Sequence, residues 1–154
     1  MKKPKLAVTD KDKIIAELVG KTEHKTLAVW ACDCAERALP YFESKYPKDD
    51  RPRLAIEAGR AWVKTGVFKM ADVRKSALAA HAAAREANDD DAARSAARAA
   101  GHALATAHVP THAVAAAIYA ATAVRDAVES ANSETATDAE REWQFQHLLN
   151  LSES

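Results

Sequence analysis

Four of the six histidines lie within residues 81–112, where they could act as metal ligands or as acid/base groups. His102 and His108 are six residues apart, and His112 follows four residues later, across the expected end of a helix and a proline corner. Zinc needs three or four such ligands at about 2.0–2.1 Å. Because no Asp or Glu lies within residues 92–125, a carboxylate ligand would have to come from another helix.

The helical positions of these histidines favour structural roles. His81 and His108 fall on apolar helix faces, where a neutral imidazole bonded to a carbonyl or a side chain is the simpler explanation. His102 continues the polar row of Arg94 and Arg98. Metal binding and catalysis stay open as alternatives. We expect no metal ion and no cofactor.

A second group of polar residues combines carboxylates and arginines at helical spacing. It consists of Asp33, Glu36, Arg37, Arg53, Glu57 and Arg60. Pairs of this kind on an exposed helix face contribute about 0.2–0.5 kcal/mol each. Trp30 and Trp62 share the same two helices, so some carboxylates could instead be shielded and pair with His81 or Arg85 of a neighbouring helix. The sequence favours solvated faces over a buried ion-pair network, and both over an acid/base site.

The motifs of common enzymes are missing from the chain. There is no glycine-rich phosphate loop, no G-x-S-x-G, no H-E-x-x-H and no C-x-x-C. Cys32 and Cys34 are two residues apart in an expected helix, so their side chains point about 200° apart and do not readily pair or share a metal. We expect two reduced thiols, at least one of them packed in the core. Because the enzyme motifs are missing, we also expect a protein that is not an enzyme.

The composition excludes further classes of protein. Of 154 residues, 22 are Lys or Arg and 22 are Asp or Glu, and this balance argues against non-specific nucleic-acid binding. No run approaches the roughly 20 apolar residues that cross a bilayer, and no signal peptide is recognisable. We therefore expect a cytoplasmic protein with one domain over residues 1–154 and flexible ends at 1–9 and 151–154.

Helical signals recur along the chain, whereas strand signals do not. The expected helices span residues 11–19, 24–42, 51–66, 71–87, 92–107 and 112–130, and a Ser/Thr/Glu/Asn loop at 131–137 precedes a last amphipathic helix. The expected N-caps are Asp10, Asp50 and Thr111, and Pro40 is expected to kink the second helix.

Alanine dominates the apolar residues, with 37 of 154 positions. Its faces let helix backbones approach closely, so dense contact compensates for the small area of each side chain. The predicted fold is all-α, a compact antiparallel bundle of about seven helices with an alanine-rich centre at residues 71–131.

Several sequence blocks resemble one known family. The blocks DCAERALPYFE and DRPRLAIEAGRAW occupy residues 33–43 and 50–62, and AAHAAAR and AAGHALATAHV occupy residues 79–85 and 99–109. In this order they are similar to a family of bacterial immunity proteins from polymorphic toxin systems, over roughly residues 24–125. The resemblance implies an all-α domain that binds and neutralises a partner toxin, and it supplies no catalytic residue.

The matching polar and aromatic positions are the candidate binding or network residues. They are Asp33, Glu36, Arg37, Arg53, Glu57, Arg60, Trp62, His81, Arg85, His102 and His108. The preferred hypothesis is stoichiometric binding of a cognate toxin, with the corners at residues 48–50 and 89–91 and the last helix as possible contacts. One alternative is a metal-binding protein or hydrolase-like enzyme in which the histidines face Asp33 or Glu57. The other is a homo-oligomeric scaffold.

Overall fold

The computed structural model describes residue 6 and residues 9–153, and it confirms the all-α fold. The helices are α1 (Asp10–Gly20), α2 (His24–Glu43), α3 (Arg51–Thr65), α4 (Met70–Glu86), α5 (Asp91–Ala105), α6 (His112–Ala127) and α7 (Ser130–Ser152). The described residues form no strand.

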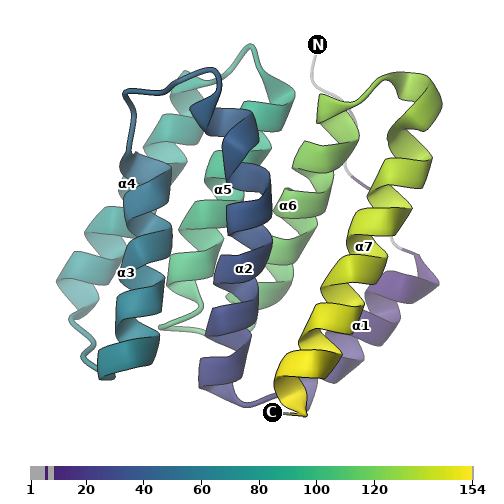
Figure 1. Cartoon of the computed structure of the whole chain (residues 1–154). Helices are drawn as coiled ribbons and strands as arrows, with labels where there is room; N and C mark the ends of the chain where they lie inside the picture. Colours follow the sequence, from purple (N-terminus) through teal and green to yellow (C-terminus); the bar gives the residue numbers. More distant parts are fainter. Residues whose placement is uncertain (1–5, 7–8, 154) are drawn as a thin grey trace.

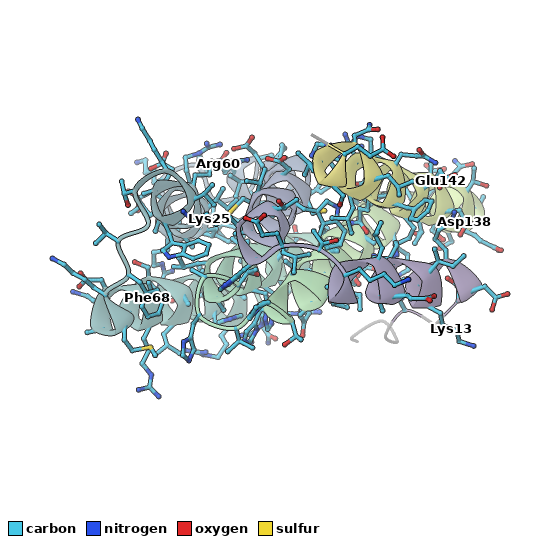
Figure 2. The ribbon with its side chains drawn as sticks, turned by 90° about the horizontal axis from the view of Figure 1, so that it is seen from below. Lys13, Lys25, Arg60, Phe68, Asp138 and Glu142 are labelled. Carbon is cyan, nitrogen blue, oxygen red and sulfur yellow. The ribbon has the colours of Figure 1, made fainter. Side chains whose placement is uncertain are left out.

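The helices form two layers. In Figure 1, α3, α2 and α7 lie side by side in the front layer, and α4, α5 and α6 form the layer behind them. The short helix α1 packs against α6 and α7 at one edge. From α2 to α7 the direction of the chain alternates, because short loops join successive helices. Figure 2 views the layers end-on, with Arg60 and Glu142 both on the side of the front layer.

The core is built around α5, which packs against α2, α3, α4 and α6. Its buried positions are mostly alanines, among them Ala93, Ala97 and Ala100, each without exposed surface. Small side chains on such a helix allow neighbours to approach closely on several sides, so that dispersion contacts replace bulky side chains. The predicted alanine-rich centre is therefore present in α5 and α6.

α4 contributes to the alanine-rich centre chiefly through its C-terminal half. Ala80, Ala83 and Ala84 in its C-terminal half are buried, but Met70 and Leu78 in its N-terminal half are 45% and 57% exposed. Val73 and Ala77 in the N-terminal half are partly buried and pack against the core, as the predicted apolar face requires.

Larger side chains fill the space around the alanines. Trp30, Phe42, Ile56 and Leu148 are almost completely buried. The indole Nε1–H of Trp30 donates to the carbonyl oxygen of Gln144 at 2.8 Å, which satisfies the one polar atom of this ring. This hydrogen bond joins α2 to α7 inside the core.

The three helix starts with predicted caps all differ from the expectation. The α1 N-cap is Thr9 rather than Asp10, since the Thr9 hydroxyl accepts from the Asp12 N–H and the Asp12 carboxylate accepts from the Thr9 N–H. Asp50 and Thr111 do occupy N-cap positions, but their side chains make no capping hydrogen bond. Both have ψ near zero instead of the extended backbone that a side-chain cap requires.

The predicted loop at 131–137 is wrong, because α7 is one continuous helix from Ser130. Its hydroxyl side chains bond within the helix: the Ser133 hydroxyl donates to the Ser130 carbonyl, and the Thr137 hydroxyl donates to the Ser133 carbonyl at 2.6 Å. No Gly or Pro interrupts the segment. The polar composition of residues 131–137 therefore reflects an exposed surface of α7 and not a break between two helices.

None of the helices in the described part of the chain is both long enough and apolar enough to span a membrane.

Candidate interaction surfaces

Asp33 on α2 is the centre of a polar network on the outer side of the front layer. Its Oδ1 lies 2.8 Å from Nη1 of Arg60 on α3, and its Oδ2 lies 2.7 Å from Nε2 of His147 on α7. Arg60 also reaches Glu36, with 3.3 Å between Nη2 and Oε2. One carboxylate thus joins three helices, and both of its oxygens have a partner.

A second pair in the same network fixes α7 against α2. The Arg37 guanidinium donates two hydrogen bonds to the Glu140 carboxylate, at 2.9 and 2.8 Å, and these bonds raise the pKa of Arg37 above its ordinary value. Arg37 also lies over the ring of Trp143 at 3.9 Å, and Trp143 stacks on His147 at 4.7 Å. We call this set of α2, α3 and α7 side chains the Asp33 network.

The remaining front-layer candidates make local contacts. Arg53 forms a bidentate pair with Glu43 at 2.7 and 2.6 Å, and this pairing lowers the pKa of Glu43. Glu57 is exposed. Trp62 is half-buried and packs on the ring of His24, with 4.8 Å between centroids.

The histidines of the rear layer meet one another. His81 of α4 contacts His102 of α5 edge-on, with 5.0 Å between ring centroids. His102 in turn stacks on His112 and Tyr119 of α6, at 5.2 and 5.3 Å. The Nδ1 atoms of His102 and His112 lie 3.0 Å apart, within hydrogen-bonding distance. We call these four residues the histidine cluster.

The side of α5 that carries His102 faces away from the front layer. α5 packs against α2 and α3 in front and against α4 and α6 on its flanks, and Arg94, Arg98 and His102 remain half-exposed. The Asp33 network and the histidine cluster therefore lie on opposite faces of the molecule.

Burial keeps the histidine cluster uncharged. Desolvation, supported by the nearby positive charges, lowers the pKa of His81 and of His102 to about 4. The largest electrostatic contributions come from Arg98 for His81 and from His81 itself for His102. Desolvation also lowers the pKa of His112. At neutral pH the cluster is thus a set of neutral rings with positive neighbours.

A glycine allows the closest contact in the cluster. A Cβ at position 101 would lie 2.7 Å from Nε2 of His81, so only glycine lets this ring rest on the α5 backbone. The Nδ1 atom of the same ring is buried and has no hydrogen-bond partner.

The structure separates residues that the sequence grouped together. His108 is exposed and stacks on Phe68 at 5.8 Å, outside the cluster, at the edge where Figure 2 labels Phe68. Asp33 is bonded to His147 and Arg60 instead of facing His81 or His102. Within the described residues, no group of three or more His, Cys, Asp or Glu is placed to hold a metal ion.

Several residues that the sequence does not single out as site residues complete the two sets. Glu140, Trp143 and His147 complete the Asp33 network from α7, a helix in which no motif was recognised. Their signal is the spacing of three and four residues, which places them on one helix face. Tyr119 completes the histidine cluster, seven residues after His112 and so on the same face of α6.

The fold and its two polar faces define a small two-layer helical domain with preorganised charged surfaces. A model of the family described as "Imm-5 like putative immunity protein" matches residues 17–151. The chain belongs to this family, and the match includes α2 to α6 completely and nearly all of α7. No curated protein and no solved structure matches the chain.

Proposed function

We propose that this protein is an immunity protein that binds a cognate toxin and neutralises it by stoichiometric, non-catalytic association in the bacterial cytoplasm. The observation that carries the proposal is the family match over residues 17–151. The matched residues include both layers of the fold and both polar faces. The family match therefore applies to nearly the whole domain and not to one motif.

The geometry suits recognition of a protein. In the Asp33 network, ion pairs and stacked rings hold the exposed side chains in place before any partner arrives. Side chains that are already ordered lose less conformational entropy on binding. Arginine and tryptophan are also frequent energetic centres of protein interfaces, and a standard interface of about 800 Å² per partner fits one face of a domain of this size.

Coexpression tests the protective role. Cells that produce the toxin encoded beside this gene should survive when this protein is produced with it, and the two proteins should copurify as a complex. A toxin from an unrelated system is the matched negative control. If the cognate pair gives neither survival nor a complex, the proposal is wrong.

A titration separates stoichiometric binding from enzymatic inactivation. We expect the residual toxin activity to fall linearly with added immunity protein and to reach its minimum at a fixed molar ratio, independent of incubation time. An enzyme would inactivate excess toxin progressively at ratios well below that endpoint. Complete, time-dependent loss at low ratios would therefore contradict the non-catalytic mechanism.

A further inference from the structure

The two polar faces differ in whether their positive charges have partners. In the Asp33 network, Arg37 is paired with Glu140, and Arg60 is paired with Asp33 and Glu36. Near the histidine cluster, no ion pair engages Arg85 or Arg98 within residues 9–153. The rear face is thus the one where an additional negative group would find unpaired donors.

Helix geometry places these two arginines beside the rings. Arg98 precedes His102 by four residues on α5, and Arg85 follows His81 by four residues on α4, so each pair shares a helix face. The two arginines act as positive charges on His81. His102 and Tyr119 are half-exposed, so a group from outside can reach the cluster.

Three carboxylates on the surrounding elements are already engaged, and Asp72 on α4 and Asp89 in the corner before α5 are exposed to water. Asp91 on α5 is bonded to Arg94, Asp126 on α6 is bonded to Arg125, and Glu86 on α4 is bonded to Arg51. The charged groups that act on the three histidine rings are all cationic or become cationic on protonation, including His108 near His112. Such surroundings repel a metal cation and attract an anion.

The cluster also contains hydrogen-bonding capacity that the fold does not use. His81 Nδ1 is buried without a partner, so no hydrogen bond fixes the orientation of this ring. The contact between the Nδ1 atoms of His102 and His112 needs one of the two to be unprotonated. A proton added to this pair would turn an acceptor into a donor, and a bound anion could accept from it.

We propose that the histidine cluster, together with Arg85 and Arg98, is an oxyanion-binding site, and that a carboxylate side chain of the toxin occupies it in the complex. A guanidinium can bind a carboxylate with two parallel hydrogen bonds, and the adjoining rings of His102 and Tyr119 offer a flat surface for the neighbouring part of the toxin. The identity of the partner rests on the proposed function, whereas the anion site itself does not.

The first test uses the full chain without toxin. The side-chain nitrogens of the histidines are followed by NMR from pH 7.5 to 3.5, in sodium chloride and in sodium trifluoroacetate at equal ionic strength. Trifluoroacetate is a carboxylate that stays charged over this range. Because a bound anion favours the protonated ring, we expect the pKa of His102 to be higher in trifluoroacetate by about half a unit or more.

Matched variants show whether this shift belongs to the site. Arg98→Gln should abolish the difference between the two salts, whereas Lys13→Gln, which removes a positive charge from the distant helix α1 (Figure 2), should leave it intact. Equal pKa values in both salts, or the same difference in Arg98→Gln, would overturn the anion site. A third series in inorganic phosphate distinguishes the source of the anion, since a shift in phosphate alone would overturn the assignment to a carboxylate.

The second test measures binding of the toxin encoded beside this gene. Arg98→Glu and Arg85→Glu should each weaken the complex at least about tenfold, because they place a negative charge where the toxin carboxylate lies. Lys13→Glu is the control, and circular dichroism and urea unfolding verify that each variant is folded.

Unchanged affinity in both arginine variants would overturn the toxin contact but leave the immunity function intact. Failure of the wild-type protein to bind the toxin would contradict the immunity function, and the salt comparison would still decide the anion site.

Discussion

Asp33 shows how a single residue determines the character of the front face. Its two carboxylate oxygens are bonded to a guanidinium from α3 and an imidazole from α7. No acceptor of this carboxylate is left without a partner, so the residue positions helices and orders the surface around it. The network therefore holds the side chains of this face in fixed positions, which agrees with the proposed binding role.

Gly59 is a second residue whose identity the packing dictates. A Cβ at this position would lie 2.8 Å from Sγ of Cys32, which is fully buried between α2 and α3. Alanine would gain about 0.5–1 kcal/mol of helix propensity, but the overlap should cost about 1–3 kcal/mol. We predict that Gly59→Ala lowers the free energy of unfolding, measured by urea denaturation.

The double variant Gly59→Ala/Cys32→Ala isolates the cause of this loss. Removing the sulfur makes room for the new methyl group, so the double variant should be more stable than the sum of the two single changes implies. Strict additivity would show that the sulfur is not the obstacle. Gly20→Ala is a control, since a Cβ at that position meets nothing within 4 Å.

The sequence predicts which polar residues share a helix face, because that depends only on their spacing within one helix. The polar row of Asp33, Glu36 and Arg37 and the separate positions of His81 and His102 follow from helical spacing. Their partners do not, because Arg37 and Glu140 are 103 residues apart in the chain and meet only through the packing of α7 on α2. A single sequence contains no direct signal for such a long-range pair.

At the scale of elements, the packing of α5 is predictable from the sequence, unlike the long-range pair Arg37–Glu140. Its alanine face already predicts a helix with close neighbours, and the structure confirms it. We predict that Ala97→Leu on α5, at a position without exposed surface, lowers the free energy of unfolding by about 1–3 kcal/mol, because the four helices around it cannot separate without losing contacts.

Ala71→Leu is the matched control for this change. It adds the same three carbon atoms at an exposed position in the first turn of α4. Its effect on urea denaturation should stay within about 0.5 kcal/mol, as for most surface substitutions. An equally small effect of Ala97→Leu would mean that the alanine face of α5 is not tightly packed.

The boundaries of the last helix were less predictable than its existence. Ser, Thr and Asn near residue 130 resemble a loop, yet α7 uses their hydroxyls to bond its own carbonyls. Its contact with α2 depends on the pair Arg37–Glu140, in which the carboxylate side chain is 7% exposed and the guanidinium is 43% exposed. The two partners therefore differ in how well water can replace a lost contact.

This difference predicts unequal effects of two variants that each remove one charge of the pair. Arg37→Met leaves the buried Glu140 carboxylate without its cation and should cost about 2–3 kcal/mol. Glu140→Gln leaves Arg37 close to water and should cost about 1 kcal/mol. Urea denaturation at pH 7 measures both, and a larger loss for Glu140→Gln would show that the arginine, not the carboxylate, is the dependent partner.

At the scale of the whole molecule, the zero net charge conceals a separation of charge. Residues 51–86 carry eight Lys or Arg and three Asp or Glu. Residues 129–153 carry one Arg and six Asp or Glu. Figure 1 places the corresponding helices α3 and α4 at one edge of the molecule and α7 at the other. Arg51, Arg53 and Arg60 at this edge are already paired with carboxylates. The attraction of an acidic partner therefore depends on the other cations of this edge, including Arg85 beside the histidine cluster.

The same cluster makes the whole protein sensitive to acid. The pKa of His81 and His102 is about 4 in the folded protein, against 6.5 for an ordinary histidine. Between these values the unfolded chain binds protons that the folded chain does not, so the free energy of unfolding falls as the pH drops from 6.5 to 4. Below about 4, protonation of Glu43 and Asp49, whose arginine partners lower the pKa of each carboxyl, removes further stability.

The double variant His81→Gln/His102→Gln should remove most of the loss between pH 6.5 and 4, because glutamine does not titrate. Urea denaturation in chloride at a series of pH values measures it, with each variant compared with its own stability at pH 7.5. His108→Gln, which removes an exposed histidine outside the cluster, is the control. An unchanged slope in the double variant would assign the acid sensitivity to other groups. In trifluoroacetate, the wild-type slope should become shallower, since an anion bound to the protonated cluster stabilises the folded state.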